Sequence, residues 1–282
     1  MASVVQDAYI SEKIVSEPIK LSSPATREFW EVPVLFEDEH LLALDKPSRL
    51  LTSPDRYDPN RPNLMKLLHA GIEKGTPWAK NRGLTYLMNA HRLDFETSGI
   101  IILAKAKPVL VALANLFGSE KPVKTYAALV RGAPAQKNFE VNAKLAPHPV
   151  KVGLIRVGEK NGKRSRTQFE LAEKFAGYSL LKCRPLTGRT HQIRAHLKHA
   201  GLPIVGDELY GGHELLLSSL KSDYRLKPKK TERPLINRVA LHAEELRLVH
   251  PMTGVEITIS SPLPKDLRVA IKYLRQYSQA AT

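Results

Sequence analysis

The chain has 282 residues, of which 43% are hydrophobic, so it can build a sizeable core as one large domain or two small ones. Its 43 Lys and Arg side chains outnumber its 28 Asp and Glu, and the net charge of +15 favours a polyanionic partner such as nucleic acid over a merely solubilising surface. A single cysteine, Cys183, excludes an intrachain disulfide, and since there is neither an apolar leader nor a run of about 20 apolar residues, we expect a soluble, cytoplasmic protein without a membrane partner.

The first half of the chain predicts a hairpin, two helices and a buried strand. Residues 1–30 are polar and mixed, and we interpret them as an extended arm rather than a domain. Asn63 can cap a helix, and an apolar run after Gly99 is typical of a buried strand. The expected elements are strands at Val32–Phe36, His40–Lys46 and Gly99–Lys105, and helices that start after Asn63 and at Pro108, the second ending at Gly118.

The second half predicts many neighbouring strands and few helices, which favours an α+β fold with a largely antiparallel sheet. Asn161-Gly162 is a turn signal, and Thr190 can cap a helix that runs to Ala200. The expected strands are Lys124–Arg131, Phe139–Leu145, Lys151–Val157, Ser165–Phe175, Tyr178–Arg184, Leu241–His250 and Val255–Ser260, followed by a C-terminal helix at Leu263–Tyr277.

Two segments concentrate positive charge. Seven basic residues and one acid lie between Lys144 and Arg166, and seven basic residues and two acids lie between Lys221 and Arg238. Each segment is punctuated by glycine or proline, which indicates a loop or hairpin tip. Either run alone is equally compatible with a solvated face, but two such runs together favour contacts with phosphate groups.

The segment from His91 to Gly99 carries the most chemical information. It places the carboxylate of Asp94 beside the basic pair His91 and Arg92, followed by two small hydroxyl residues and an apolar run. A nucleophilic carboxylate held beside an anionic substrate would use this order, whereas an exposed loop has little need of it.

A second segment, Arg184–Lys198, predicts a helix with a basic face. Ile193, Leu197 and Ala200 form an apolar stripe at helical spacing, and Arg194 borders that stripe. A partly buried guanidinium needs an anion, and Asp94 is our candidate. The alternative is an ordinary structural ion pair.

These segments, with three others, occur in the order found in the RluA-like pseudouridine synthases, and from about Val32 to Ser260 the chain resembles that family. The matching pieces are His91-Arg92-Leu93-Asp94 with Thr97-Ser98-Gly99, Lys124-Thr125-Tyr126, Leu186 to Arg194, Gly206-Asp207 with Tyr210-Gly211, and Leu241-His242-Ala243. The resemblance implies an α+β pseudouridine synthase catalytic fold, a mostly antiparallel mixed β-sheet with flanking helices and loops around a central cleft.

The resemblance also implies an isomerase that converts uridine in structured RNA, transfer or ribosomal, to pseudouridine without cofactor or metal. Asp94 matches the catalytic aspartate, Tyr126 the tyrosine that stacks on the flipped uracil, and Arg194 the basic residue that pairs with the aspartate. On spacing alone, Tyr126 is more easily interpreted as a core residue. Together with the basic segments, this gives an RNA-binding set of His91, Arg92, Lys163, Arg164, Arg166, Arg189, Lys229 and Lys230.

Two departures from the family pattern matter. The family usually continues Ser-Gly after the Lys46-Pro47 pair, but here Ser48 is followed by Arg49. Many relatives carry an N-terminal S4-type domain, but here residues 1–30 form an extension too short for one, before a catalytic domain at 31–282. We therefore expect a monomer whose catalytic domain alone binds the RNA.

Other chemistries fit less well. Ser98 lacks a Gly-x-Ser-x-Gly context, residues 158–165 fail the P-loop spacing, and His196 with His199 lack a third metal ligand. Two rival functions share the same segments: a non-catalytic RNA-binding or RNA-folding protein, and a glycosidase that releases uracil from RNA.

Overall fold

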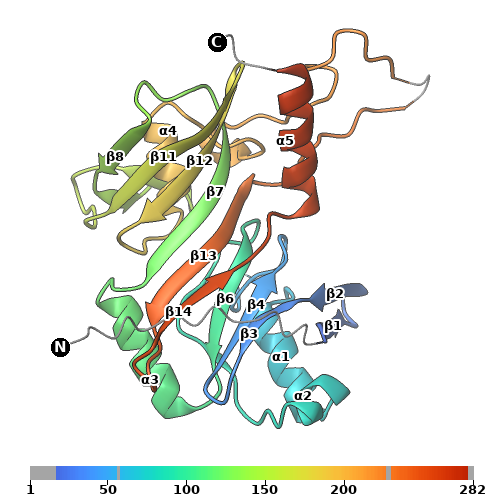
Figure 1. Ribbon diagram of the computed structural model, residues 1–282, viewed down its shortest axis with the longest axis vertical. Coiled ribbons are helices and arrows are strands. Elements are labelled where there is room, and N and C mark those ends of the chain that lie inside the picture. Colours follow the sequence, from blue (N-terminus) through green and yellow to red (C-terminus); the bar gives the residue numbers. More distant parts are fainter. Residues whose placement is uncertain (1–16, 56–57, 227–229, 279–282) are drawn as a thin grey trace, which may run out of the picture. The chain divides into compact units, whose positions relative to one another are not determined.

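The computed structural model describes residues 17–55, 58–226 and 230–278, which divide into two compact units (Figure 1). Unit 1 comprises the described residues up to Phe95, together with Gly99–Val123 and Glu245–Ser261. Unit 2 comprises Glu96–Ser98, the described residues of Lys124–Glu244, and those from Pro262 on. In the part of the chain described, no helix is both long and apolar enough to cross a membrane.

Unit 1 holds the N-terminal strands and three helices. Its elements are β1 (Ile19–Ser23), β2 (Glu28–Val32), β3 (Val34–Glu37), β4 (Leu41–Lys46), α1 (Leu64–Glu73), α2 (Pro77–Asn81), β5 (Met88–Asn89), nearly all of β6 (Ser98–Ala104), α3 (Lys107–Gly118), the second half of β13 (Leu241–Val249) and β14 (Glu256–Ser260). Strand β4 pairs with both β3 and β6, and β13 pairs with β14; all three pairings are antiparallel. The strands predicted at residues 32–36, 40–46 and 99–105 are confirmed, as is the hairpin predicted from Leu241–His250 and Val255–Ser260.

Where we expected an extended arm, residues 19–32 form two paired strands; residues 1–16 of that expected arm lie outside the described residues. Strands β1 and β2 form an antiparallel hairpin in which Ile19 faces Val32, and both side chains are fully buried. They pack in the same apolar cluster as Leu64 and Leu68 of α1. The alternation of Ile19, Lys20 and Leu21 is the strand signal, because side chains two residues apart lie on one face of a strand.

Local capping and burial explain the elements before the candidate site. The side chain of Asn63 accepts a hydrogen bond from the Lys66 amide at 2.9 Å, so the predicted helix cap is confirmed. Every residue of β6 is buried, as an uninterrupted apolar run predicts. Strand β6 thus gives the segment that ends at Asp94 a rigid continuation.

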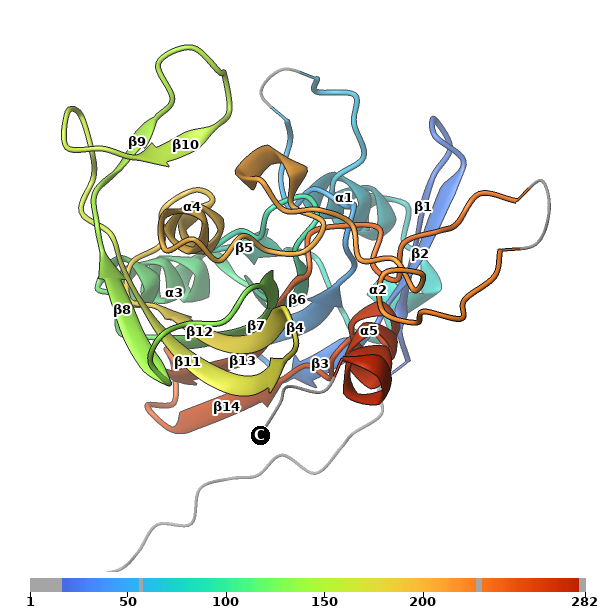
Figure 2. The ribbon, with the colours of Figure 1, turned by 90° about the horizontal axis from the view of Figure 1, so that it is seen from above.

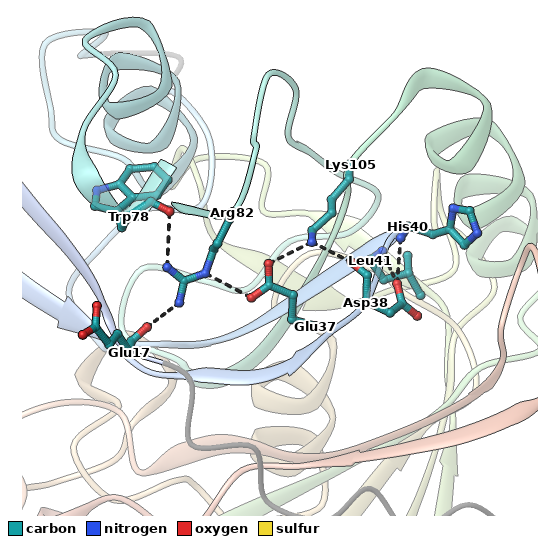
Figure 3. Close-up of polar contacts among 8 residues, drawn as sticks. All are labelled: Glu17, Glu37, Asp38, His40, Leu41, Trp78, Arg82 and Lys105. Atoms are coloured by element: carbon teal, nitrogen blue, oxygen red, sulfur yellow. Dashed lines mark hydrogen bonds and ion pairs between the residues drawn. The ribbon is translucent and has the colours of Figure 1, made fainter. Parts of the chain in front are cut away.

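A polar network fixes the turns of unit 1 (Figure 3). The carboxylate of Glu37 accepts hydrogen bonds from Arg82 Nε at 3.0 Å and from Lys105 Nζ at 2.8 Å. Asp38 Oδ1 accepts the amides of His40 and Leu41, at 2.8 and 2.7 Å. This network joins the β3–β4 turn to the residue after α2 and to the residue after β6, and the charged side chains of Glu37, Asp38, Arg82 and Lys105 all have partners in it.

Unit 2 is built on an antiparallel sheet in the order β7–β12–β11–β8. Its elements are β7 (Val123–Arg131), β8 (Asn138–Asn142), β9 (Leu145–Pro147), β10 (Ile155–Val157), β11 (Arg166–Phe175), β12 (Tyr178–Pro185), α4 (Gln192–His199), the short 3-10 helix η1 (Glu208–Tyr210), the first half of β13, and α5 (Lys265–Tyr277). The expected α+β class and the C-terminal helix are confirmed. The strand expected at residues 151–157 is shorter, beginning at Ile155.

Two helices pack on this sheet. Ile193 and Leu197 of α4 and Leu267 and Leu274 of α5 lie in one buried cluster with the sheet residues, including Cys183. Burial raises the pKa of the Cys183 thiol, so this cysteine is a packing residue as predicted. Strands β9 and β10 form a separate antiparallel hairpin that lies beside α4 (Figure 2).

Candidate active site

The backbone around Asp94 is held by the loop that follows β4. Thr52 Oγ1 donates to the Leu93 carbonyl at 3.0 Å and accepts from the Leu93 amide at 3.1 Å. On the other side of the aspartate, the Arg49 amide donates to the Phe95 carbonyl at 2.7 Å. Asp94 itself is partly buried. Its carboxylate is therefore carried on a segment whose two flanking residues are both fixed.

The two basic residues that precede Asp94 differ in their surroundings. His91 Nε2 accepts a hydrogen bond from the Ile102 amide at 3.1 Å, and its ring stacks on Phe117 at 4.6 Å between centroids. Arg92 is exposed. The imidazole of His91 thus supports the Asp94 segment from β6 and α3, and its role as an RNA contact, like that of Arg92, stays a prediction.

In unit 2, Arg194 forms a buried bidentate ion pair with Asp207. The guanidinium donates through Nε to Oδ2 at 2.7 Å and through Nη2 to Oδ1 at 2.8 Å, and the side chains are only 9% and 1% exposed. The buried anion that Arg194 requires is therefore present in its own unit. The sequence predicts Asp94 for this role, and a pairing of Arg194 with Asp94 stays a prediction.

Tyr210 connects Arg194 to the β9–β10 hairpin. The guanidinium carbon of Arg194 lies 4.9 Å from the centre of the Tyr210 ring, close enough for a cation–π interaction. The Tyr210 hydroxyl accepts the Ile155 amide at 3.1 Å and lies 3.0 Å from Nδ1 of His191, to which it can donate. The resemblance includes Tyr210 without assigning it a role, and its contacts make it the support of Arg194.

The start of α4 differs from the sequence prediction. Thr190 does not cap the helix, which begins at Gln192 after His191 in the left-handed conformation, φ 52°. Instead, the Gln192 side-chain oxygen accepts the Arg189 amide at 3.0 Å and the Thr187 hydroxyl at 2.6 Å. The first residue of the helix thus bonds back to the preceding turn, in place of a capping residue before the helix. The prediction that Thr190 caps the helix was wrong for this reason.

His196 anchors α4 from within. Its Nε2 donates to the Ala143 carbonyl at 3.1 Å, which leaves Nδ1 to accept from the Thr167 hydroxyl at 2.8 Å. The residue is fully buried, and this burial lowers the pKa of its imidazole. Both ring nitrogens of the neutral form have partners, so the histidine acts as a polar core residue that holds the helix bearing Arg194.

Tyr126 lies on β7 opposite Cys183 of β12 and is partly buried. Its neighbours Thr125 and Ala127 are buried, and its ring packs against the core cluster of unit 2. This position suits a core residue with one accessible face, and the stacking role implied by the resemblance stays a prediction.

The basic residues after β10 have uneven surroundings. Lys163 pairs through its backbone with Leu145, and the Arg164 carbonyl accepts Arg189 Nε at 3.1 Å. The guanidinium of Arg166 lies 2.7 Å from a Glu140 oxygen, and this hydrogen bond raises the pKa of Arg166. All four basic side chains are exposed, as is that of Lys230; Lys229 lies outside the described residues.

Comparison with known proteins places these segments in a family. Residues 40–199 match the family model described as RNA pseudouridylate synthase. The chain is 32% identical to ribosomal large subunit pseudouridine synthase D of Zymomonas mobilis, over 91% of this chain and 77% of that one. It is 34% identical to ribosomal large subunit pseudouridine synthase C of Escherichia coli, over 86% and 70%.

Solved structures share the fold. The human protein described as RNA pseudouridylate synthase domain containing 4 superposes with a TM-score of 0.64 at 22% identity, over 86% of this chain and 92% of that one. The human RNA pseudouridylate synthase domain containing 1 gives 0.58 at 22% identity, over 89% and 97%. At this identity the likeness concerns the fold alone.

Proposed function

The chain belongs to the RNA pseudouridylate synthase family and is an isomerase that converts uridine to pseudouridine in RNA, and from this premise we propose that Asp94 is its catalytic aspartate and large-subunit ribosomal RNA its substrate. The observation that carries the proposal is the fixed backbone on both sides of Asp94, through Leu93 and Phe95. A carboxylate that must meet one carbon of a large substrate needs such a rigid carrier.

The reaction exchanges one bond of the nucleotide for another. The bond between N1 and C1′ breaks, the uracil turns, and C5 joins C1′, while the proton on C5 is lost and N1 gains one. Positive charge develops at C1′ when the glycosidic bond weakens. The Asp94 carboxylate acts there, either as a nucleophile that forms a covalent adduct or as a charge that stabilises the intermediate.

Arg194 and Tyr126 complete the proposed catalytic set. The Asp207 pair and the Tyr210 ring fix the guanidinium of Arg194, so it enters the reaction with its orientation already set. Such preorganisation lets a charged group act on the reacting centre without reorienting during the reaction. The ring of Tyr126 would stack on the uracil once the nucleotide has left its helix, a step that favours unpaired uridines.

The choice of RNA follows the relatives. Two proteins at 32% and 34% identity, each matched over most of its length, are named for the large ribosomal subunit. Transfer RNA, which the sequence alone left equally open, is the second candidate. Mapping pseudouridines in both RNAs, from cells with and without the gene, tests this choice; loss of sites from transfer RNA alone would contradict it.

Asp94→Asn tests the catalytic assignment, since it keeps the side-chain shape and removes the charge. RNA that carries tritium at uracil C5 releases the label when C5 joins C1′, so turnover is read directly. We expect no detectable release from Asp94→Asn and RNA binding within a few-fold of wild type, because phosphate contacts lie elsewhere. The matched control is Asp223→Asn, an exposed carboxylate, which should keep full turnover.

The same assay separates the rival functions. A glycosidase would release free uracil and leave the label on C5, and a purely RNA-binding protein would bind without releasing either. Turnover by Asp94→Asn at the wild-type rate would refute the role of Asp94 and leave the family assignment intact.

A further inference from the structure

The C-terminal helix α5 presents a basic side to solvent. It contains a single acid and four basic residues, which are Lys265, Arg268, Lys272 and Arg275. The residues that pack in the core of unit 2 are Leu267, Ala270, Ile271 and Leu274. At about 3.6 residues per turn, Lys265, Arg268 and Lys272 project away from this buried stripe, and all three are exposed. Three positive charges thus lie together on one side of the helix.

These three charges have no ion-pair partner among the residues that the structure describes. Arg275, by contrast, binds both oxygens of Glu173, at 2.8 and 2.7 Å. Arg268 and Lys272 are four residues apart, a spacing at which like charges on a helix repel each other. Lys265 is the first residue of the helix, where the helix dipole disfavours a cation. The basic side therefore costs the helix stability, and a bound polyanion would offset that cost.

A stacked pair of tyrosines borders the basic side. The rings of Tyr273 and Tyr277 are 6.1 Å apart between centroids, with an angle of 18° between their planes, and both side chains are partly exposed. Lys221 Nζ lies 5.8 Å from the centre of the Tyr277 ring. Aromatic rings beside positive charges are the arrangement on which proteins stack the bases of unpaired nucleic acid.

The basic segment between Lys221 and Arg238 is attached to α5 at both ends. Lys221 lies over the tyrosine pair, and Arg238 binds both oxygens of Asp266 on α5, at 2.7 and 3.0 Å. Figure 1 shows the segment beside the helix, and its Arg225 and Arg233 are exposed. The positive charge of this segment therefore adds to that of the helix on the same part of unit 2.

We name the outer side of the helix the α5 surface, which consists of Lys265, Arg268, Lys272, Tyr273 and Tyr277. Helix α4, which carries Arg194, lies on a different part of the unit 2 sheet from α5 in both views (Figures 1 and 2). The α5 surface is therefore separate from the arginine proposed for catalysis. Any RNA on it would be a part of the substrate that does not react.

We propose that the α5 surface binds an unpaired stretch of the substrate RNA away from the uridine that is modified. Its three cations contact phosphates, and its tyrosine pair stacks on a base. The net charge of +15 and the RNA substrate of the family supply the complementary partner. The proposal rests on RNA as the substrate and not on the role of Asp94.

The first experiment measures affinity for polyuridylate, a single-stranded probe, against salt. We expect Arg268→Gln with Lys272→Gln to bind about tenfold more weakly and to lower the slope of log affinity against log salt by about 1.4, two contacts at about 0.7 each. The melting temperature should stay at or above that of the wild type, because the repulsion is relieved. At saturating RNA, tritium release should stay near wild type, since α5 lies outside the proposed catalytic set.

The matched control removes the same two charges from arginines that already bind carboxylates. Arg275 binds Glu173 and Arg247 binds Glu245, and both arginines are exposed. Arg247→Gln with Arg275→Gln should therefore change the slope much less. An equal fall in the two double variants would mean that only net charge matters, and a wild-type slope in the α5 variant would mean a solvated face. Either result would overturn the proposal.

The tyrosine pair gives an independent measurement, because stacking does not depend on salt as a phosphate contact does. Tyr273→Leu should weaken polyuridylate binding about tenfold with an unchanged salt slope, whereas Tyr273→Phe should keep the affinity. Wild-type affinity in Tyr273→Leu would overturn the role of the tyrosine pair. Failure of the Asp94 assignment is seen separately, in tritium release by Asp94→Asn.

Discussion

Two buried arginines of unit 2 form nearly identical ion pairs. Arg194 binds both oxygens of Asp207 at 2.7 and 2.8 Å, and Arg238 binds both oxygens of Asp266 at 2.7 and 3.0 Å. The arginine side chains are 9% and 3% exposed. The geometry of the ion pair alone therefore does not distinguish the proposed catalytic arginine, Arg194, from a structural one, because both pairs satisfy the rule that a buried charge is paired.

The remaining neighbours separate the two. The third nitrogen of Arg238, Nη1, donates to backbone carbonyls, those of Glu96, Val239 and Leu241. Arg194 instead lies against the aromatic ring of Tyr210. The hydrogen bonds of Arg238 thus hold α5 against the start of β13, whereas a carboxylate and an aromatic ring set the orientation of Arg194. We therefore interpret Arg238 as a structural residue and Arg194 as a charged group held in one orientation.

Removing the carboxylate of each pair should have the largest effect, and an unequal one. Asp207 is 1% exposed, so Asp207→Asn leaves a buried guanidinium without its anion, at a cost of roughly 3–5 kcal/mol in the free energy of unfolding. Asp266 is 34% exposed, and water can partly replace it, so Asp266→Asn should cost less. Urea unfolding of both variants measures the difference; equal losses would contradict the burial argument.

Shortening each arginine to lysine tests function rather than stability. Lysine keeps the charge and loses the planar bidentate geometry. We expect Arg194→Lys to lower kcat about 100-fold, or about 2.7 kcal/mol, as losing an oriented catalytic donor does. Arg238→Lys, once shown to be folded, should stay within a few-fold of wild type. Tritium release at saturating RNA measures kcat for both variants, and similar losses of kcat would mean that Arg194 too is a structural residue.

The contributions of His196 and Asp266 to the free energy of unfolding should be lost in different pH ranges. Burial lowers the pKa of His196, which anchors α4, so between its folded and unfolded pKa values the unfolded chain binds more protons. The stabilisation is complete above about pH 6.5 and is lost as the pH falls through the lower, folded pKa. His196→Asn should therefore flatten the pH dependence of unfolding below pH 6.5. An unchanged profile would contradict this assignment.

Asp266 should act in a more acidic range. Burial by itself raises the pKa of Asp266, but the hydrogen bonds and charge of Arg238 and the Leu267 amide outweigh it, and the net shift is downward. Its contribution is present above about pH 4 and is lost as the pH falls below that value. Asp266→Asn should remove this acidic loss and leave the His196 range unchanged, which unfolding curves at pH 7, 5 and 3 would show.

The sequence predicted correctly several elements that depend on residues close together in the chain. The cap at Asn63, the buried strand after Gly99 and the closing hairpin each depend on a few neighbouring residues, and all three are confirmed. Thr190 failed as a cap because Gln192, a residue not expected to cap a helix, turned back onto the Arg189 amide. The N-terminal hairpin was missed although Ile19 and Leu21 alternate with polar residues.

The candidate site was predicted only in part, for a different reason. Arg194 could be recognised as a buried cation from its helical stripe, but its pairing with Asp207 could not, because a stripe does not say which carboxylates lie opposite. Asp207 is 13 residues further along and is brought back to Arg194 by the loop after α4, which turns at Gly206. Pairing of this kind is set by tertiary structure, and the same holds for Arg166 and Glu140.

That pairing changes the smallest effect we predict, on the basic residues beside β10. The sequence treated Lys163, Arg164 and Arg166 as equivalent phosphate contacts, but Arg166 already binds Glu140. Lys163→Ala with Arg164→Ala should lower the salt slope of RNA binding by about 1.4–1.8, two contacts at 0.7–0.9 each. Arg166→Ala alone should change it much less, because a guanidinium that is already bound to Glu140 contacts no phosphate and so contributes little to the slope. Saturated turnover should stay near wild type in both variants, because none of the three residues belongs to the proposed catalytic set. If Arg166→Ala shifts the slope as much as the other two substitutions together, phosphate displaces Glu140 from Arg166 when RNA binds. The exposed Arg166–Glu140 ion pair would then be an RNA-binding site rather than a structural contact.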